Sequence, residues 1–351
     1  MNQLTDRKHF VDNLRAFTVL FLFPLHISMI YNNWGEQFYV SGAGLLPSSL
    51  FVHISSVWMM PLLFAIAGIS SRYALEKRNA HEYIKERFGK LLVPLAFGLL
   101  LVIPIQSYLA GLFHNGHANY FDFFTRVTDL YGSDGSFTPA HLWFILFLFI
   151  YSIVFLPVML SYKNRVNQEF LGKTPILVLI LLGLIPVFAH PLLDIGGKSL
   201  GEYASYFLLG FFFLANENVL VKLEKFRFLL LGLLVAGATL TLIFDHVFYE
   251  AVSWLSILAI IGLARRYLNF SNSVTGYLVK SSFGVYVFHQ SWIVVTAFFI
   301  LKITGNPVIQ IPLIFLSSVA LTFSTYEICR RVSIFCRIFG LKKAAVSFNI
   351  P

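Results

Sequence analysis

The chain has 351 residues, of which 57% are hydrophobic and only 12% are charged, and its net charge is +9. Soluble globular domains carry about twice this charged fraction, so the composition excludes that class and indicates an integral membrane protein. The basic residues fall in short loops between apolar runs rather than in one patch. We therefore expect the lipid bilayer as a partner and no nucleic acid.

The apolar runs are too long and too continuous for the alternating strands of a porin, so we predict an all-α, polytopic membrane protein. The length leaves room for about ten transmembrane helices and for no separate soluble domain, so residues 1–351 are interpreted as one membrane-embedded domain. The predicted helices cover residues 14–31, 50–71, 91–109, 141–160, 176–189, 202–214, 228–244, 250–264, 282–300 and 308–329.

The first predicted helix has Arg15 at its start and His26 deep inside it. On a helix these residues lie on one stripe, about 20° and roughly 16 Å apart. If Arg15 lies at the cytoplasmic boundary of a hydrocarbon core roughly 30 Å thick, His26 lies near its middle. An ionisable residue at that depth indicates a functional site, and the alternative is a structural histidine bonded to a neighbouring helix.

The distribution of Lys and Arg predicts the topology. The ten-helix layout places 23 of the 26 on one side, including the basic stretch 72–90 and the C-terminal tail. Only Arg126, Lys198 and Lys302 fall on the other side, where the longest polar loop covers residues 110–140. By the positive-inside rule both termini are cytoplasmic and this loop lies outside.

Seven polar residues fall inside or at the ends of the predicted helices: His26, His53, His141, Glu202, Asp245, His289 and Gln290. Charges near membrane boundaries cost little, so solvation by headgroups is the favoured interpretation for Glu202 and Asp245. His53 and His141 lie at outer helix ends, where an interfacial and a functional role have equal weight. His289 and Gln290 lie about two turns inside the ninth helix, which favours a functional interpretation.

Three observations argue against a metal cofactor. The two cysteines, Cys329 and Cys336, have a spacing that fits neither a zinc site nor a disulfide framework. The chain lacks both a Walker loop and an HExxH motif. We therefore predict no metal.

Six segments in order along the chain carry a resemblance to a known family. They are Phe10-Val-Asp-Asn-Leu-Arg15 with His26 after ten further residues, Leu62-Leu-Phe-Ala-Ile-Ala-Gly-Ile, Arg72-Tyr-Ala-Leu, Arg87-Phe-Gly-Lys-Leu-Leu-Val-Pro94, His141-Leu-Trp-Phe-Ile-Leu and Ser282-Phe-Gly-Val-Tyr-Val-Phe-His289-Gln290. Together they resemble the acyltransferase-3 family of membrane acyltransferases over nearly the whole chain. Pro61-Leu-Leu-Phe and Val102-Ile-Pro-Ile-Gln106-Ser-Tyr are similar to its branch of glucan-succinylating proteins.

The resemblance implies transfer of an acetyl or succinyl group from cytoplasmic acyl-CoA to a hydroxyl of a cell-surface or lipid-linked carbohydrate acceptor, in a bacterial plasma membrane. It makes His26 and Arg15 the catalytic candidates, with His26 as a base or as an acyl-carrying nucleophile. The expected donor-binding residues are basic: Arg15, Arg72, Arg87 and Lys90. Further candidates are Asp12, which could orient Arg15, and His141, Trp143, His289 and Gln290.

One position departs from the family pattern. The basic loop often carries a second arginine three residues after the first, and Lys90 stands there in this chain. Lysine can meet a phosphate as a point charge but not as a bidentate fork. Two alternatives to an enzyme stay open: a glycan or lipid transporter that makes no bond, and a regulatory or scaffold membrane protein.

Overall fold

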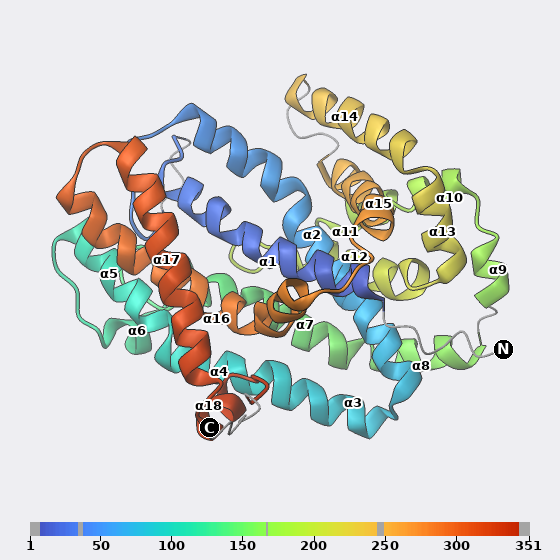
Figure 1. The fold of residues 1–351 in the computed structure, drawn as a ribbon, viewed down its shortest axis with the longest axis horizontal. Coiled ribbons are helices and arrows are strands. Elements are labelled where there is room, and N and C mark those ends of the chain that lie inside the picture. The colour runs from blue at the N-terminus through green and yellow to red at the C-terminus, as the bar shows by residue number, and fades with distance from the viewer. Residues whose placement is uncertain (1–7, 34–37, 166–167, 244–248, 344–351) are drawn as a thin grey trace, which may run out of the picture. The chain divides into compact units, whose positions relative to one another are not determined.

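The computed structural model describes residues 8–33, 38–165, 168–243 and 249–343. Within these ranges the chain forms helices joined by loops and no strand, as Figure 1 shows. The all-α prediction is therefore confirmed. Asp245, one of the predicted polar candidates, lies outside the described residues.

The helices are α1 (His9–Ile30), α2 (Leu46–Lys77), α3 (Ala80–Arg87), η1 (Phe88–Leu92), α4 (Val93–Leu101), α5 (Ile103–Asn115), α6 (Asp122–Thr125), η2 (Ala140–Leu142), α7 (Trp143–Val154), α8 (Leu156–Arg165), α9 (Gln168–Gly172), α10 (Ile176–Leu181), α11 (Leu184–Ala189), α12 (Leu200–Leu209), η3 (Gly210–Leu214), α13 (Glu217–Lys225), α14 (Arg227–Ile243), α15 (Tyr249–Tyr267), α16 (Ser273–Ile303), α17 (Pro307–Cys329) and α18 (Ser333–Ile338).

Each of the ten predicted segments is helical where it is described, but not all are long enough to cross a membrane. Among the described residues, five helical stretches are long and apolar enough to cross a membrane: α1, α2, the run Ala80–Asn115, α16 and α17. Two bent pairs raise the number to seven: α7 with α8, bent by 55°, and α12 and η3 with α13, bent by 98°. Ile176–Ala189 and Arg227–Thr241 are shorter apolar helices. The count of ten and the cytoplasmic termini stay predictions.

Prolines explain two of the breaks. Pro94 follows the π-helical turn η1. Helix α5 begins directly after the non-helical Val102, and Pro104 is its second residue. A proline inside a helix lacks an N–H donor and clashes with the carbonyl four residues earlier. A wider π turn or a local break accommodates the ring, so the run Ala80–Asn115 changes helix type rather than ending.

The chain divides into two compact units. The first comprises residues 1–18, 53–85 and 150–279, as far as they are described. Inside it α2 meets the α12–η3 segment at backbone distance, because a Cβ on Gly68 would lie 2.0 Å from the Phe207 carbonyl oxygen. A Cβ on Gly210 would lie 2.2 Å from the Ala65 carbonyl oxygen. Small residues that allow such approach are typical of helix pairs in membranes.

The second unit comprises residues 19–52, 86–149 and 280–351, described as far as residue 343. Helix α16 lies against α17 closely enough that a Cβ on Gly284 would be 2.6 Å from the Tyr326 ring. The segment after α18 returns to α4, where Gly340 has a φ of +61° and faces Pro94. Only glycine takes that backbone conformation readily, so this close return depends on it.

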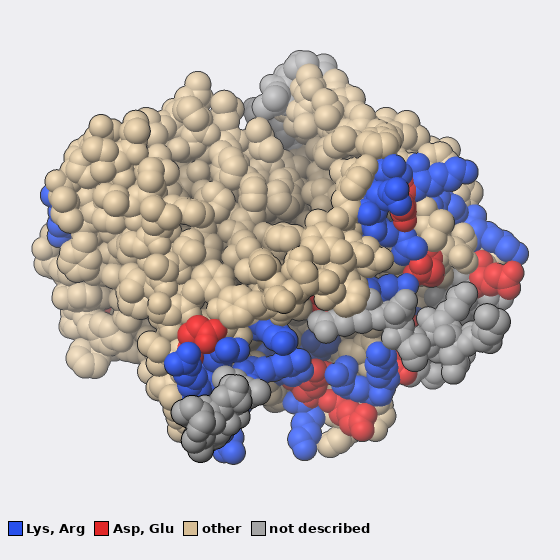
Figure 2. Space-filling model, in the orientation of Figure 1, with Lys and Arg blue, Asp and Glu red and all other residues tan. Residues whose placement is uncertain are grey.

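The surface is largely uncharged. Figure 2 shows uncharged residues over most of the visible face, with Lys and Arg gathered in restricted areas. In the second unit the exposed basic residues around α18 are Arg331, Arg337, Lys342 and Lys343. Large apolar side chains are exposed elsewhere, such as Ile303 at 78% and Val308 at 79%. An apolar exposed surface of this kind is expected where lipid replaces water.

Candidate active site

Three histidine rings from distant parts of the sequence meet in the second unit. His26 comes from α1, His141 from η2 and His289 from α16. The His289 ring is central, with its centroid 5.2 Å from that of His26 and 4.9 Å from that of His141. His289 is completely buried and His141 is 6% exposed. We call these three residues the histidine cluster.

Backbone carbonyls of α16 orient two of the rings. Nδ1 of His289 lies 2.7 Å from the Tyr286 carbonyl oxygen, and Nε2 of His141 lies 3.0 Å from that of Val287. A carbonyl oxygen only accepts, so each of these nitrogens carries the proton and donates it. The proton-free nitrogens of the neutral rings are then Nε2 of His289 and Nδ1 of His141.

These two nitrogens are buried and have no hydrogen-bond partner among the described residues, and the same holds for Nδ1 of His26. Buried polar atoms in proteins are nearly always bonded, because an unsatisfied one costs roughly 1 to 3 kcal/mol. Three such atoms on three adjacent rings therefore indicate a site shaped for something other than packing. The open nitrogens can accept protons or attack a carbonyl carbon.

His26 differs from its two partners in exposure, because part of its side chain is accessible whereas His141 and His289 are buried. Its ring stacks on Phe38 at 5.9 Å with 16° between the planes. His114 contacts the Phe38 carbonyl oxygen at 2.8 Å through Nε2, which ties the loop after α1 to α5. His26 is thus the least buried residue of the cluster.

The backbone before His141 is strained. Ala140 has a φ of 44°, in the left-handed region that residues with a Cβ rarely adopt. Its N–H donates to Oγ1 of Thr138 at 2.9 Å, and the Tyr286 hydroxyl donates to the His141 carbonyl oxygen. Strain of this kind persists where surrounding contacts hold it, and it gathers at functional sites.

A chain of buried amides and hydroxyls flanks the cluster. Nε2 of Gln290 donates to Oε1 of Gln106 at 3.0 Å, and Nε2 of Gln106 donates to Oγ of Ser291 at 2.6 Å. These bonds join α16 to α5 next to His289. Sequence analysis selected Gln290 but passed over Gln106, Tyr286 and Phe38. An amide inside the apolar run 91–109 was the signal that could have identified Gln106.

The predicted cationic residues lie in both units. In the first unit, Arg15 makes an ion pair with Asp12 at 2.8 Å, the orienting contact that the sequence predicted. In the second unit, Arg87 and Lys90 lie three residues apart in the run Ala80–Asn115, and Lys90 contacts Glu86 at 2.5 Å. The side chains of Arg15 and Lys90 are 37% and 58% exposed, so both have room for a ligand.

Arg72, in the first unit, has a different environment. Its side chain is 8% exposed, contacts Glu76 at 3.2 Å and lies over the Tyr162 ring at 5.0 Å. These are contacts of a packed residue. Trp143 opens α7 and packs edge-on against Phe147 at 5.2 Å.

Two helix-end interpretations need comment. Glu202, expected to be solvated by headgroups, is only 6% exposed and contacts His190 at 2.8 Å, so that interpretation is wrong. His53 lies two turns inside α2, because this helix begins at Leu46 rather than at residue 50. His53 is therefore not at a helix end.

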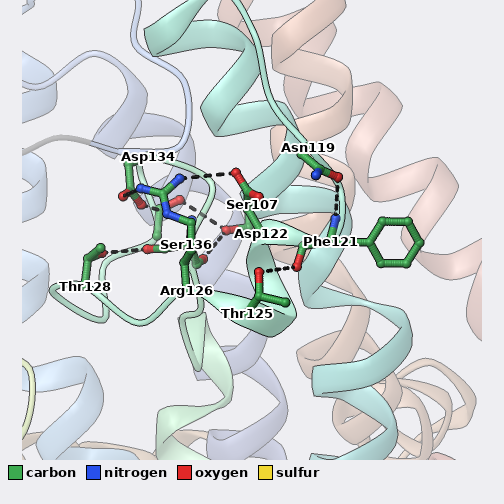
Figure 3. A network of polar contacts seen from close by, with 10 residues as sticks. Ser107, Asn119, Phe121, Asp122, Thr125, Arg126, Thr128, Asp134 and Ser136 are labelled. Atoms are coloured by element: carbon green, nitrogen blue, oxygen red, sulfur yellow. Dashed lines mark hydrogen bonds and ion pairs between the residues drawn. The ribbon is translucent and has the colours of Figure 1, made fainter.

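The loop predicted to face outward is ordered by its own charges (Figure 3). Arg126 contacts Asp122 and Asp134, each at 3.2 Å, and the Ser107 hydroxyl of α5 donates to the Ser136 carbonyl oxygen at 2.5 Å. Partial burial by itself raises the pKa of Asp134, but hydrogen bonds from Ser136 and the charge of Arg126 outweigh it, so the pKa lies below its ordinary value. Ser136 itself is completely buried.

The chain is similar in sequence to known proteins. The acyltransferase-3 family profile, described as an acyltransferase domain, matches residues 8–327. The chain is 23% identical over 325 residues to glucans biosynthesis protein C of Escherichia coli strain K12, covering 81% of this chain and 82% of the relative. It is 25% identical over 378 residues to the protein of that name from Salmonella schwarzengrund strain CVM19633, covering 96% and 95%. No solved structure matches the chain. The chain therefore belongs to the acyltransferase-3 family of membrane proteins, and it is an O-acyltransferase.

Proposed function

We propose that this enzyme moves an acetyl or succinyl group from cytoplasmic acyl-CoA to a hydroxyl of a cell-surface or lipid-linked glycan in a bacterial plasma membrane. The names of the relatives, glucans biosynthesis protein C, and their bacterial sources support the acceptor class and the location. The observation that carries the chemistry is the histidine cluster, with one open buried nitrogen on each of three adjacent rings.

His26 is the residue that acts on the acceptor. As a base it takes the hydroxyl proton while the hydroxyl oxygen attacks the thioester carbon; as a nucleophile it first carries the acyl group itself. Both routes form one ester bond and break one thioester bond, and the hydroxyl proton ends on the released CoA thiol. His289, 5.2 Å away between ring centroids, donates from its protonated nitrogen to a backbone carbonyl and leaves Nε2 open.

The donor-binding candidates are Arg15 in the first unit and Arg87 and Lys90 in the second. A guanidinium has five N–H donors, so Arg15 can keep its contact with Asp12 and still offer donors to a phosphate. Arg72 is the weakest member of the predicted donor set, because its side chain is 8% exposed and lies over an aromatic ring.

The test is His26→Ala, assayed with acyl-CoA and glycan and compared by melting temperature in the same detergent. Acyl transfer should fall at least about a hundredfold, the usual effect of removing a positioned proton-transfer group. The melting temperature should change little. His117→Ala is the matched control, because this histidine lies in an exposed stretch and bonds only the Asn115 carbonyl oxygen through Nδ1 among the described residues.

A well-folded His26→Ala enzyme that transfers acyl groups near the wild-type rate would defeat the catalytic assignment. A purified protein that moves glycan across vesicles without consuming acyl-CoA would identify a transporter instead. Mass spectrometry of surface glycans from cells with and without the protein identifies the acyl group and its acceptor.

A further inference from the structure

A second group of ionisable side chains lies in the first unit, where three helix ends meet. His190 caps the C-terminus of α11, Glu202 lies in the first turn of α12 and Glu250 in the first turn of α15. Nδ1 of His190 is 2.8 Å from Oε2 of Glu202 and 3.1 Å from Oε1 of Glu250. One ligand atom from each residue lies within 4.8 Å of the other two.

Glu202 is buried, Glu250 is half-buried and His190 is exposed. The side chains of Glu202 and Glu250 are 7% and 14% exposed, whereas that of His190 is 53% exposed. Within the described ranges His190 is the only basic side chain that pairs with either carboxylate. A protonated imidazole supplies one positive charge against two negative ones, and its single Nδ1–H cannot point at both oxygens. Burying an uncompensated charge is expensive, and a bound cation would supply the missing positive charge.

The three ligating positions are held by contacts that involve no ion. Oγ of Ser199 donates to the His190 carbonyl oxygen at 2.7 Å and accepts from the Glu202 backbone N–H at 3.1 Å. A Cβ on Gly201 would lie 2.2 Å from the Ala189 carbonyl oxygen, so the end of α11 and the start of α12 are in backbone contact. The Tyr206 hydroxyl donates to the Glu250 carbonyl oxygen at 3.1 Å and fixes α15.

We propose that His190, Glu202 and Glu250 bind one divalent transition-metal ion of the Zn²⁺ class. Ligands at about 2.0 to 2.2 Å from tetrahedral zinc lie roughly 3.3 to 3.6 Å apart, so the 2.8 and 3.1 Å separations from Nδ1 of His190 need to open by about 0.2 to 0.8 Å. A neutral imidazole with two carboxylates and a divalent ion has no net charge. Imidazole favours zinc and its neighbours over calcium and magnesium, which prefer oxygen ligands.

The ion would join the ends of three helices, and the exposed side of His190 leaves coordination positions for water. The topology predicted from sequence puts the turn after α11 on the outer side, where an ion can enter without crossing the membrane. Sequence analysis predicted no metal because the three ligands come from separate segments and form no recognised spacing. This site does not depend on the acyl-transfer assignment.

The experiment uses full-length protein in detergent, stripped with a chelator and dialysed against Zn²⁺. We expect one zinc per chain by elemental mass spectrometry and a higher melting temperature with zinc. Glu202→Gln and His190→Ala should each weaken zinc binding by at least about a hundredfold, since even the loss of a residue that supports a ligand costs about 10- to 100-fold. They should also remove the zinc-dependent rise in melting temperature.

Two variants serve as matched controls. Glu169→Gln removes a carboxylate whose side chain is 75% exposed and pairs with Lys173, and His117→Ala removes an exposed histidine. Both should bind zinc like the wild type. Co²⁺ in place of Zn²⁺ should give visible d–d absorption without a thiolate charge-transfer band, which separates this site from the two cysteines and needs no variant.

Three results would overturn the proposal. The first is less than one zinc per chain at micromolar zinc. The second is zinc bound equally by the wild type, Glu202→Gln and His190→Ala. The third is a cobalt spectrum with thiolate charge transfer. The first result would leave a protonated His190 between the two carboxylates as the whole of the site.

Discussion

Replacing His289 by asparagine separates its packing role from its chemical role. The amide nitrogen of asparagine takes the place of Nδ1 and can donate to the Tyr286 carbonyl oxygen, a contact of 2.7 Å in the wild type. Nothing takes the place of Nε2, the open nitrogen of this ring. The change therefore keeps one hydrogen bond and removes the open proton-accepting nitrogen of this ring.

The stability cost follows from the surroundings. The lost ring atoms lie among the rings of Phe23, His26 and His141, whose centroids are 5.8, 5.2 and 4.9 Å from that of His289. A small cavity there should cost about 1 to 2 kcal/mol. His289→Ala should cost roughly 0.5 to 1.5 kcal/mol more, because it also removes the hydrogen bond to the Tyr286 carbonyl oxygen. The expected order of melting temperatures is wild type, asparagine variant, alanine variant.

Activity should not follow that order. If the open nitrogen exchanges a proton with His26, both variants lose at least about a hundredfold in acyl transfer per folded molecule. The assay is single-turnover acyl transfer from acyl-CoA in one detergent preparation. Trp292→Phe is the matched control, since it lies on the same helix and loses a 2.9 Å hydrogen bond to Thr325 without touching the cluster. An asparagine variant with activity within about threefold of wild type would make His289 a packing residue.

Three further predictions concern the donor set, the topology and the outer loop. Arg15→Ala and Arg87→Ala should each weaken acyl-CoA affinity about ten- to a hundredfold in a donor titration, because each removes a charge-assisted contact of roughly 1.5 to 3 kcal/mol. In a cysteine-free background, cysteine at exposed Val127 should react with an impermeant reagent from outside, and cysteine at exposed Asn79 should not. The lowered pKa of Asp134 stabilises the fold above the ordinary Asp pKa of about 3.9, and this stabilisation is lost as pH falls through the folded value. Asp134→Asn should therefore lower the melting temperature more at about pH 7 than near pH 3.

Each prediction has a contradicting result. Unchanged donor affinity in both arginine variants would remove the phosphate-binding assignment. Labelling at Asn79 and none at Val127 would reverse the topology, and labelling at both would end the ten-helix layout. A melting-temperature difference between Asp134→Asn and wild type that is the same at both pH values would assign the effect to packing rather than to charge.

The fold was predictable to the extent that it depends on composition. Long apolar runs form helices in a membrane because every backbone polar group must be satisfied within its own segment. The breaks were harder to predict, although their causes are visible as Pro94 and Pro104. A hydropathy average over a whole span does not register a single residue, so those helices were expected to be continuous.

The site was predictable one residue at a time but not as a group. His26 was identified from its depth in the first helix, and His289 from its place inside the ninth. Their contact with His141, and the open nitrogens that result, depend on how α1, η2 and α16 pack. Ser136 shows the same limit, because this serine of the polar loop 110–140 is completely buried. Its backbone N–H donates to Asp134, and its carbonyl oxygen accepts from Ser107 of α5.

The fixed tautomers of His141 and His289 limit how protons can be transferred during the reaction. In their neutral forms the protons of both rings are committed to the Val287 and Tyr286 carbonyl oxygens, so neither ring has a spare proton to give. On the proposed function, the neutral cluster can only accept a proton, and it does so when an acceptor hydroxyl arrives. The next cycle cannot begin until the thiolate of the departing CoA has taken this proton from the cluster. Slow thiol release would then leave the cluster charged, and acyl transfer would slow before the donor runs out.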